Sequence, residues 1–195
     1  MKKLNYLKAV VVVHGKSELQ ICQYIKQKLR LKIEIESDKH GEKAIQITSI
    51  KHILSNKKFK SKDAFLRNFN FIELYEKGKN INSDFRIFFI MDTDDCTEEQ
   101  KKKFKNKEMF KDHWAYDYIV PIYNSPELET VLEKAGVPFK KAGIKRKKEY
   151  IKLFPTDDKY NKTDVMQIEE LLNNLKFIKE TNMDEFLKFC LDCSE

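Results

Sequence analysis

The 195-residue sequence predicts an α/β fold in which helices flank a mostly parallel β-sheet. The expected strands at residues 8–13 and 86–91 contain continuous apolar runs at 9–13 and 87–91, rich in β-branched and aromatic side chains, which is typical of strands buried on both faces. The first is followed by a turn and then by apolar residues at helical spacing, and the second by a turn and a lysine-rich helical segment. Strands and helices that alternate in this way favour parallel pairing with right-handed crossovers.

The remaining elements follow from periodicity and turn residues. The turn at residues 14–18 leads into a helix that Ser17 is placed to cap, and Pro126 is placed in the first turn of a later helix. Residues 32–36 alternate as a strand does. The other expected elements, in chain order, are helices at 47–54, 62–71 and 98–110, a strand at 118–123, and helices at 127–135, 164–177 and 183–193.

Length and composition predict an α/β domain over residues 1–136, with a basic segment and a C-terminal helical extension over residues 137–195 packed on the same domain. The longest apolar runs are far shorter than the about 20 residues that cross a bilayer. The N-terminal segment has no signal-peptide pattern. We therefore expect a cytoplasmic protein with no membrane association and with reduced cysteines.

A net charge of +7 favours anionic partners, nucleic acid above all. Residues 140–148 hold six lysines and arginines in nine positions, among them Lys145, Arg146 and Lys147. These three residues, together with Lys16 near the first strand, are candidates for contacts with phosphate. The basic segment fits a solvated loop or helix face equally well.

Three carboxylates follow the second buried strand directly, at Asp92, Asp94 and Asp95. In an open parallel sheet ligands bind at the carboxyl ends of the strands, and Glu18 follows the first strand by one short turn. Carboxylates are the ligands that Mg²⁺ prefers. The sequence thus predicts a divalent-metal site with Glu18, Asp92 and Asp94 as ligands. The alternative is a polar turn in which Asp95 caps the next helix and Glu18 stabilises a helix dipole.

Residues 10–18 (VVVVHGKSE) and 89–94 (FIMDTD) resemble the TOPRIM domain, in which one strand ends in Glu-Gly and a later strand ends in Asp-x-Asp. The resemblance covers roughly residues 8–136 and is greatest to stand-alone and overcoming-lysogenization-defect nucleases. It implies a Rossmannoid sheet, Mg²⁺ or Mn²⁺ as cofactor, cleavage of nucleic acid and a role in phage defence. Asp92 and Asp94 match the Asp-x-Asp motif.

This sequence departs from the family at His14, which stands where the family has its leading glutamate. The resemblance leaves three alternatives: Glu18 takes over, the site prefers Mn²⁺, or catalysis is lost. Residues 124–129 (NSPELE) are similar to the Asn-x-Pro segment of stand-alone TOPRIM proteins. Glu127 or Glu129 would then complete a second metal position, although both also suit the first turn of a solvated helix.

The expected function is metal-dependent hydrolysis of nucleic-acid phosphodiesters, in which Asp92 and Asp94 hold the cation and Glu18 or His14 positions or deprotonates water. One alternative is a catalytically degenerate TOPRIM module that binds nucleic acid or a protein. The resemblance also implies a partner protein or ATPase, since the chain itself has no phosphate-binding Gly-x-x-x-x-Gly-Lys-Ser/Thr loop. A further alternative is a haloacid-dehalogenase-like phosphatase with Asp92 as nucleophile, but in that family the motif comes earlier in the chain.

Overall fold

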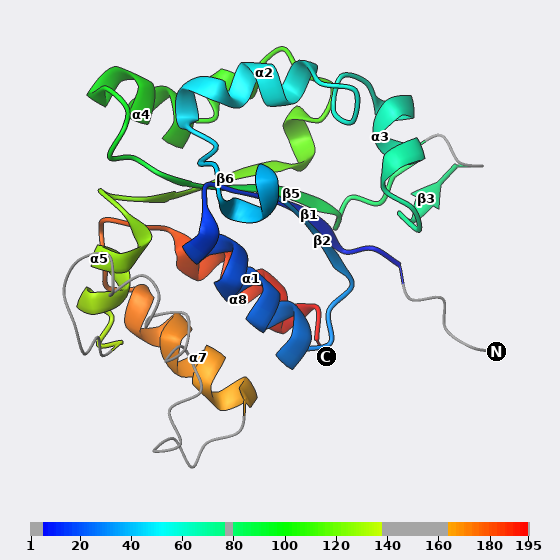
Figure 1. Ribbon diagram of the computed structural model, residues 1–195. Helices are drawn as coiled ribbons and strands as arrows, with labels where there is room; N and C mark the ends of the chain where they lie inside the picture. The colour runs from blue at the N-terminus through cyan, green and yellow to red at the C-terminus, as the bar shows by residue number, and fades with distance from the viewer. Residues whose placement is uncertain (1–5, 77–79, 138–163, 195) are drawn as a thin grey trace.

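Four strands form one parallel sheet in the computed structural model, which describes residues 6–76, 80–137 and 164–194 (Figure 1). The strand order is β2-β1-β5-β6, and every neighbouring pair is parallel. This arrangement confirms the predicted α/β fold with a parallel sheet. The strands are β1 (Ala9–Val13), β2 (Ile33–Glu36), β5 (Arg86–Asp92) and β6 (Ile119–Asn124).

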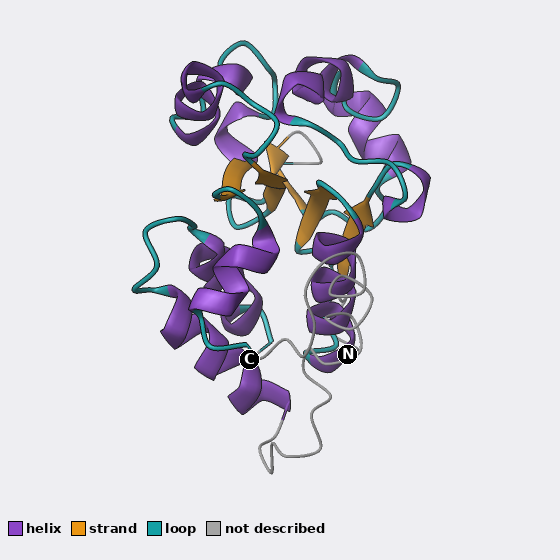
Figure 2. Ribbon diagram, turned by 60° about the vertical axis from the view of Figure 1, so that its left-hand side comes forward, coloured by secondary structure: helices purple, strands orange, loops and turns teal. Residues whose placement is uncertain are grey.

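Helices cover both faces of the sheet, and Figure 2 shows them as two groups with the strands between them. One face carries helices from both ends of the chain: α1 (Lys16–Lys28), α5 (Leu128–Lys134), α7 (Asp164–Leu175) and α8 (Met183–Asp192). The other face carries the middle of the chain: η2 (Ile47–Ser49), α2 (Ile50–Ser55), α3 (Lys62–Asn68), α4 (Glu98–Lys105) and η3 (Glu108–Phe110). Two short helices, η1 (Lys39–Gly41) and η4 (Tyr116–Tyr118), lie in connecting segments.

The continuous apolar runs arise because alternate residues of a central strand enter different cores. In β1, Val11 and Val13 belong to the core beneath α1 and α8, whereas Val10 and Val12 belong to the core beneath α2 and α3. All five residues of β1 are buried. Because both faces of such a strand are buried, polar side chains are found only where the strand ends.

The C-terminal helices α7 and α8 contribute to the same core as α1. Leu175, Phe186 and Leu187 are fully buried there, and the ring of Phe186 packs edge-on against Phe88 of β5 with 5.1 Å between centroids. The helical C-terminal part of the described chain is thus integral to one face of the sheet.

Several local predictions were wrong in detail. Gly15 rather than Ser17 is the N-cap of α1, and Glu127 is the N-cap of α5, so Pro126 lies before that helix. The helix expected at 98–110 stops at Lys105, and Lys107 adopts a left-handed conformation (φ 64°) before η3. The hairpin of β3 (Leu74–Tyr75) and β4 (Asn80–Ile81) was not anticipated.

One glycine is required by the fold. Gly41 has φ +81°, and a Cβ atom there would lie 3.0 Å from the Cα of Lys16. The loop after β2 therefore packs directly on the N-terminus of α1. Among the described residues, no helix combines the length and apolar character needed to cross a bilayer.

Candidate metal centre

The carboxyl ends of β1, β5 and β6 lie side by side at one edge of the sheet. The register pairs Val13 with Ile90 and Asp92 with Asn124, and the backbone N–H of His14 donates to the carbonyl of Ile90 at 2.9 Å. Polar residues that are far apart in sequence therefore meet where these strands stop. Parallel pairing alone accounts for this convergence.

Asp92 lies at the centre of this edge and is only 5% exposed. Its Oδ1 accepts hydrogen bonds from the backbone N–H of Leu128 (3.1 Å) and from Nδ2 of Asn124 (3.3 Å). Burial raises the pKa of Asp92 well above its usual value, and the charges of Glu18 and Glu129 raise it further, whereas the bond from Asn124 lowers it. The carboxylates of β5, α1 and α5 thus interact electrostatically where water has little access.

Glu18 and Glu129 come from the first turns of α1 and α5, and each is 1% exposed. Oε2 of Glu18 accepts the N–H of Gly15 at 2.9 Å, which closes the N-terminal turn of α1. Oγ of Ser17 donates to Oε1 of Glu129 at 2.7 Å. The Ser17 hydroxyl, which the sequence suggested as a helix cap, instead links the N-terminal turns of α1 and α5.

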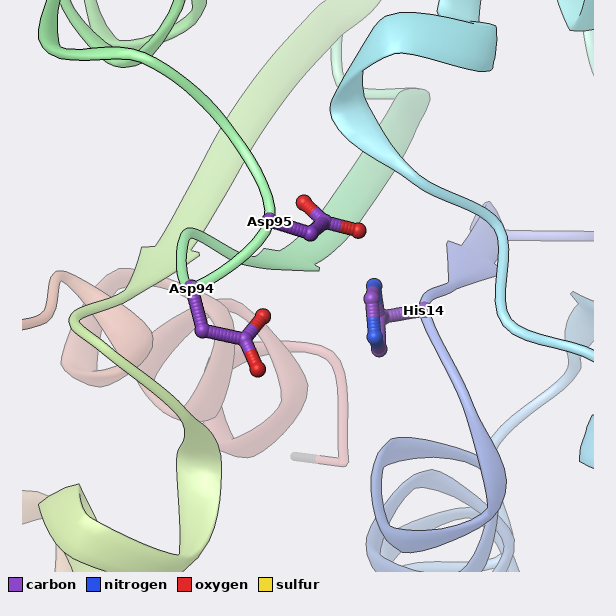
Figure 3. A group of neighbouring side chains, drawn as sticks. All are labelled: His14, Asp94 and Asp95. Carbon is purple, nitrogen blue, oxygen red and sulfur yellow. The ribbon is translucent and has the colours of Figure 1, made fainter.

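A second, more open group lies beside the buried carboxylates. His14, Asp94 and Asp95 each offer one ligand atom, and these atoms lie within 4.8 Å of one another. Figure 3 shows His14 at the end of β1 facing the carboxylates of the loop that follows β5. Asp94 is exposed, so the group is open to solvent on that side.

The alternative in which Asp95 caps α4 does not hold in the structure. Thr97 is the N-cap of that helix, and its Oγ1 accepts the N–H of Gln100 at 3.2 Å. Partial burial raises the pKa of Asp95, whereas His14 lowers it and Asp94 raises it. Asp95 therefore belongs electrostatically to the group at the edge.

Of the predicted ligands, Glu18 and Asp94 lie close enough for their charges to act on Asp92. Among the described residues, however, the three do not form a group whose ligand atoms lie within 4.8 Å of one another. Glu129, rather than the partly exposed Glu127, is the glutamate of the third segment whose charge acts on Asp92. Lys16 is exposed in the first turn of α1. The predicted phosphate contacts Lys145, Arg146 and Lys147 lie outside the described residues.

The side chains at this edge suit a divalent cation. Five carboxylates gather there, from Glu18, Asp92, Asp94, Asp95 and Glu129. Within residues 6–76, 80–137 and 164–194, Asp92 forms no ion pair with lysine or arginine. In the same ranges, Nδ1 of His14 and Oδ1 of Asp95 are buried without a hydrogen-bond partner. Buried anionic oxygens without cationic partners are costly, and hard divalent ions compensate such charge.

Sequence reasoning placed the segments of Ser17 and Asn124 at this edge but assigned neither side chain a contact with the carboxylates, and it did not include Thr181. Ser17 bonds to Glu129, and Asn124 is fully buried between Asp92 and the hydroxyl of Thr181. The signals for Asn124 were its place at a strand end and the Asn-x-Pro resemblance, and neither indicates a bond to Asp92. Thr181 lies 57 residues further on and has no local signal.

The fold and this edge define the class: an α/β protein with a parallel sheet and a carboxylate-rich site at the carboxyl ends of its strands. Comparisons with protein-family models, curated proteins and solved structures found no match.

Proposed function

We propose that this protein is a metal-dependent phosphodiesterase that acts on nucleic acid, a nuclease of the TOPRIM type that uses Mg²⁺ or Mn²⁺. The observation that carries the proposal is the burial of Asp92 beside the charges of Glu18 and Glu129, with Asp94 exposed next to it. Folding such a group of like charges is unfavourable unless a ligand neutralises it. Sites of this kind are commonly functional.

Each residue has a role that its surroundings support. Asp92 is held in one orientation by Asn124 and Leu128, so it is suited to ligate an ion through its second oxygen. Asp94 offers an exposed carboxylate beside it. A divalent cation bound there would polarise a phosphoryl oxygen and lower the pKa of an attacking water.

Two further residues would act on water and substrate. His14 lies at the open rim, where its imidazole can position an attacking water. Lys16 is exposed one turn away and can contact a phosphate of the chain. Both roles agree with a substrate that approaches from the solvent side of Asp94.

The same geometry supports a phosphatase with Asp92 as nucleophile less well. The carboxylate is 5% exposed, and one of its oxygens already accepts two hydrogen bonds. A nucleophile needs an accessible oxygen in line with the phosphorus atom. The acidic pair Asp157 and Asp158, which that reaction would also need, lies outside the described residues.

A second candidate function rests on His14. Because it replaces the glutamate that the family uses, the chain would be a degenerate module that binds nucleic acid or a protein, an ATPase among the candidates, without cleaving. Binding and cleavage separate the two functions: tight binding of nucleic acid without any metal-dependent turnover would favour the module.

The full chain should be incubated with supercoiled DNA, single-stranded DNA and RNA in EDTA, Mg²⁺ or Mn²⁺. We expect cleavage only with a divalent ion, and a loss of roughly 100-fold or more in Asp92→Ala, comparable to the removal of a principal charge-stabilising group. Asp112→Asn, an exposed acidic residue away from the edge, is the matched control. Cleavage by Asp92→Ala at the wild-type rate would refute the proposed nuclease.

A further inference from the structure

We propose that His14, Asp94 and Asp95 form a second cation position that binds a transition-metal ion, tested as Mn²⁺, more tightly than Mg²⁺. This position extends the proposed function because Asp94 belongs to both groups. It makes its own claim, however, about which ion binds and through which atoms. Its test therefore needs no nucleic acid.

The backbone holds the three ligands in place from several sides. The N–H of His14 donates to Ile90 in β5 at 2.9 Å, and its carbonyl accepts the N–H of Ile45 at 2.7 Å. The loop that carries Asp94 and Asp95 is anchored at Thr93, whose N–H lies 3.0 Å from the carbonyl of Asn124 and 2.8 Å from that of Pro126. The ligand atoms are thus brought within 4.8 Å without a flexible segment between them and the sheet.

Two polar atoms of these side chains are unsatisfied. Nδ1 of His14 and Oδ1 of Asp95 are both shielded from solvent, and neither has a hydrogen-bond partner among the described residues. Asp94 remains exposed, which leaves room for water or a phosphate oxygen in the remaining coordination positions.

The donor set determines the preferred ion. Carboxylate oxygens alone suit Mg²⁺, whereas imidazole nitrogen is a ligand of transition-metal ions, so one imidazole with two carboxylates favours such an ion over Mg²⁺. The buried group of Glu18, Asp92 and Glu129 offers only oxygen. This edge therefore carries two chemically different sites. The buried one offers only oxygen ligands, and the one at the rim offers one nitrogen and two carboxylates.

Asp94 is the residue through which the two places would be coupled. Its charge acts on Asp92 in the buried group, and its carboxylate is one of the three ligands at the rim. Paired ions in phosphoryl-transfer sites are about 3.5–4 Å apart and commonly share a carboxylate. A shared Asp94 would make binding of one ion depend on the other.

The test uses the metal-free full chain and Mn²⁺ or Mg²⁺ alone. Calorimetry should give two Mn²⁺ ions per wild-type chain and one per chain in His14→Ala. Electron spin-echo spectroscopy of the Mn²⁺ complex should show coupling to a directly bound imidazole nitrogen in the wild type, absent in His14→Ala. Asp95→Asn should weaken the rim ion at least about tenfold. His52→Ala, an exposed histidine on α2, should retain both ions.

The variant His14→Glu is the sharpest comparison, because it replaces nitrogen by oxygen and keeps a ligand. We expect the rim position to lose its preference for Mn²⁺ and to bind Mg²⁺ more tightly than the wild type does. Unchanged stoichiometry and no nitrogen coupling in the wild type would overturn the rim site even if the protein cleaves nucleic acid. Two Mn²⁺ ions with nitrogen coupling but no cleavage would instead refute the proposed nuclease and leave the rim site standing. Circular dichroism confirms that each variant is folded.

Discussion

Thr181 hydrogen-bonds to Asn124 at 3.0 Å and thereby connects the loop before α8 to the acidic edge. Asn124 is completely buried, and its amide donates to Asp92. Oγ1 of Thr181 in turn accepts the N–H of Met183 at 3.0 Å. The orientation of the central carboxylate is therefore set by a chain of hydrogen bonds that begins at the N-terminus of the last helix.

Thr181→Val should destabilise the protein by about 1–3 kcal/mol, because the buried side-chain oxygen of Asn124 and the N–H of Met183 both lose their partner. Urea denaturation measures this free energy of unfolding. Thr48→Val, at an exposed position in η2, should change it by less than about 0.5 kcal/mol. Equal effects of the two substitutions would show that the Thr181 hydroxyl is not a structural link.

Asp92→Asn should stabilise the metal-free protein by about 0.5–2 kcal/mol, as substitutions of strained functional residues often do. The folded state raises the pKa of Asp92, so it binds this proton more tightly than the unfolded chain does. The contribution of Asp92 to the stability of the metal-free wild type is therefore fully present below about pH 4 and is lost as pH rises through the raised pKa. Denaturation in EDTA between pH 4 and 8 measures the difference.

Mg²⁺ should reverse this order. The ion stabilises the wild type by binding the folded state, and Asp92→Asn loses that gain. Asp112→Asn should follow the wild type at every pH, with and without the ion. If Asp92→Asn were less stable than the wild type in EDTA at pH 8, the carboxylate would be stabilising and the electrostatic description of this edge would be wrong.

Glu129→Gln should reduce metal-dependent cleavage at least about tenfold, whereas Glu127→Gln should reduce it less than about twofold. Glu129 is 1% exposed and its charge acts on Asp92, but Glu127 lies at the N-cap of α5 and is partly exposed. Single-turnover cleavage rates at saturating Mg²⁺ distinguish the two residues. A larger effect at Glu127 would mean that substrate or metal approaches from the other side of α5.

Lys16→Ala should weaken binding of single-stranded nucleic acid and reduce the slope of log K against log salt by about 1, because one phosphate contact is lost. Lys28→Ala is the matched control, since it removes the same charge at the opposite end of the same helix. Fluorescence anisotropy between 50 and 300 mM salt measures both slopes. Equal slopes for the two variants would remove Lys16 from the binding surface.

The sheet could be predicted from the sequence because a strand that is buried on both faces is an unbroken run of apolar residues. Residues 9–13 and 87–91 stand out for this reason, and parallel pairing then brings the polar residues that follow them together. The meeting of Glu18 with Asp92 followed from topology alone and needed no knowledge of side-chain contacts. The short hairpin of β3 and β4 has too few residues for such a pattern.

The bonds within the site could not be predicted, because they join side chains without sequence periodicity. Ser17 has the residue type of a helix cap, but Gly15 takes that place and frees the hydroxyl for Glu129, 112 residues away. Asp95 likewise has the type of a cap, but Thr97 with Gln100 forms a capping box. In both cases a neighbouring residue caps the helix. The contacts of Ser17 and Asp95 are then set by the tertiary structure.

The hydroxyl that supports Asn124, and through it Asp92, comes from a segment that follows every carboxylate of this edge in the sequence. A chain that ends before Thr181 would carry the same acidic residues but would leave Asn124 without its hydroxyl donor. The packing of Phe186 on Phe88 would be missing from the sheet as well. Removal of the last described helix would therefore loosen both the core on that face and the orientation of the central carboxylate.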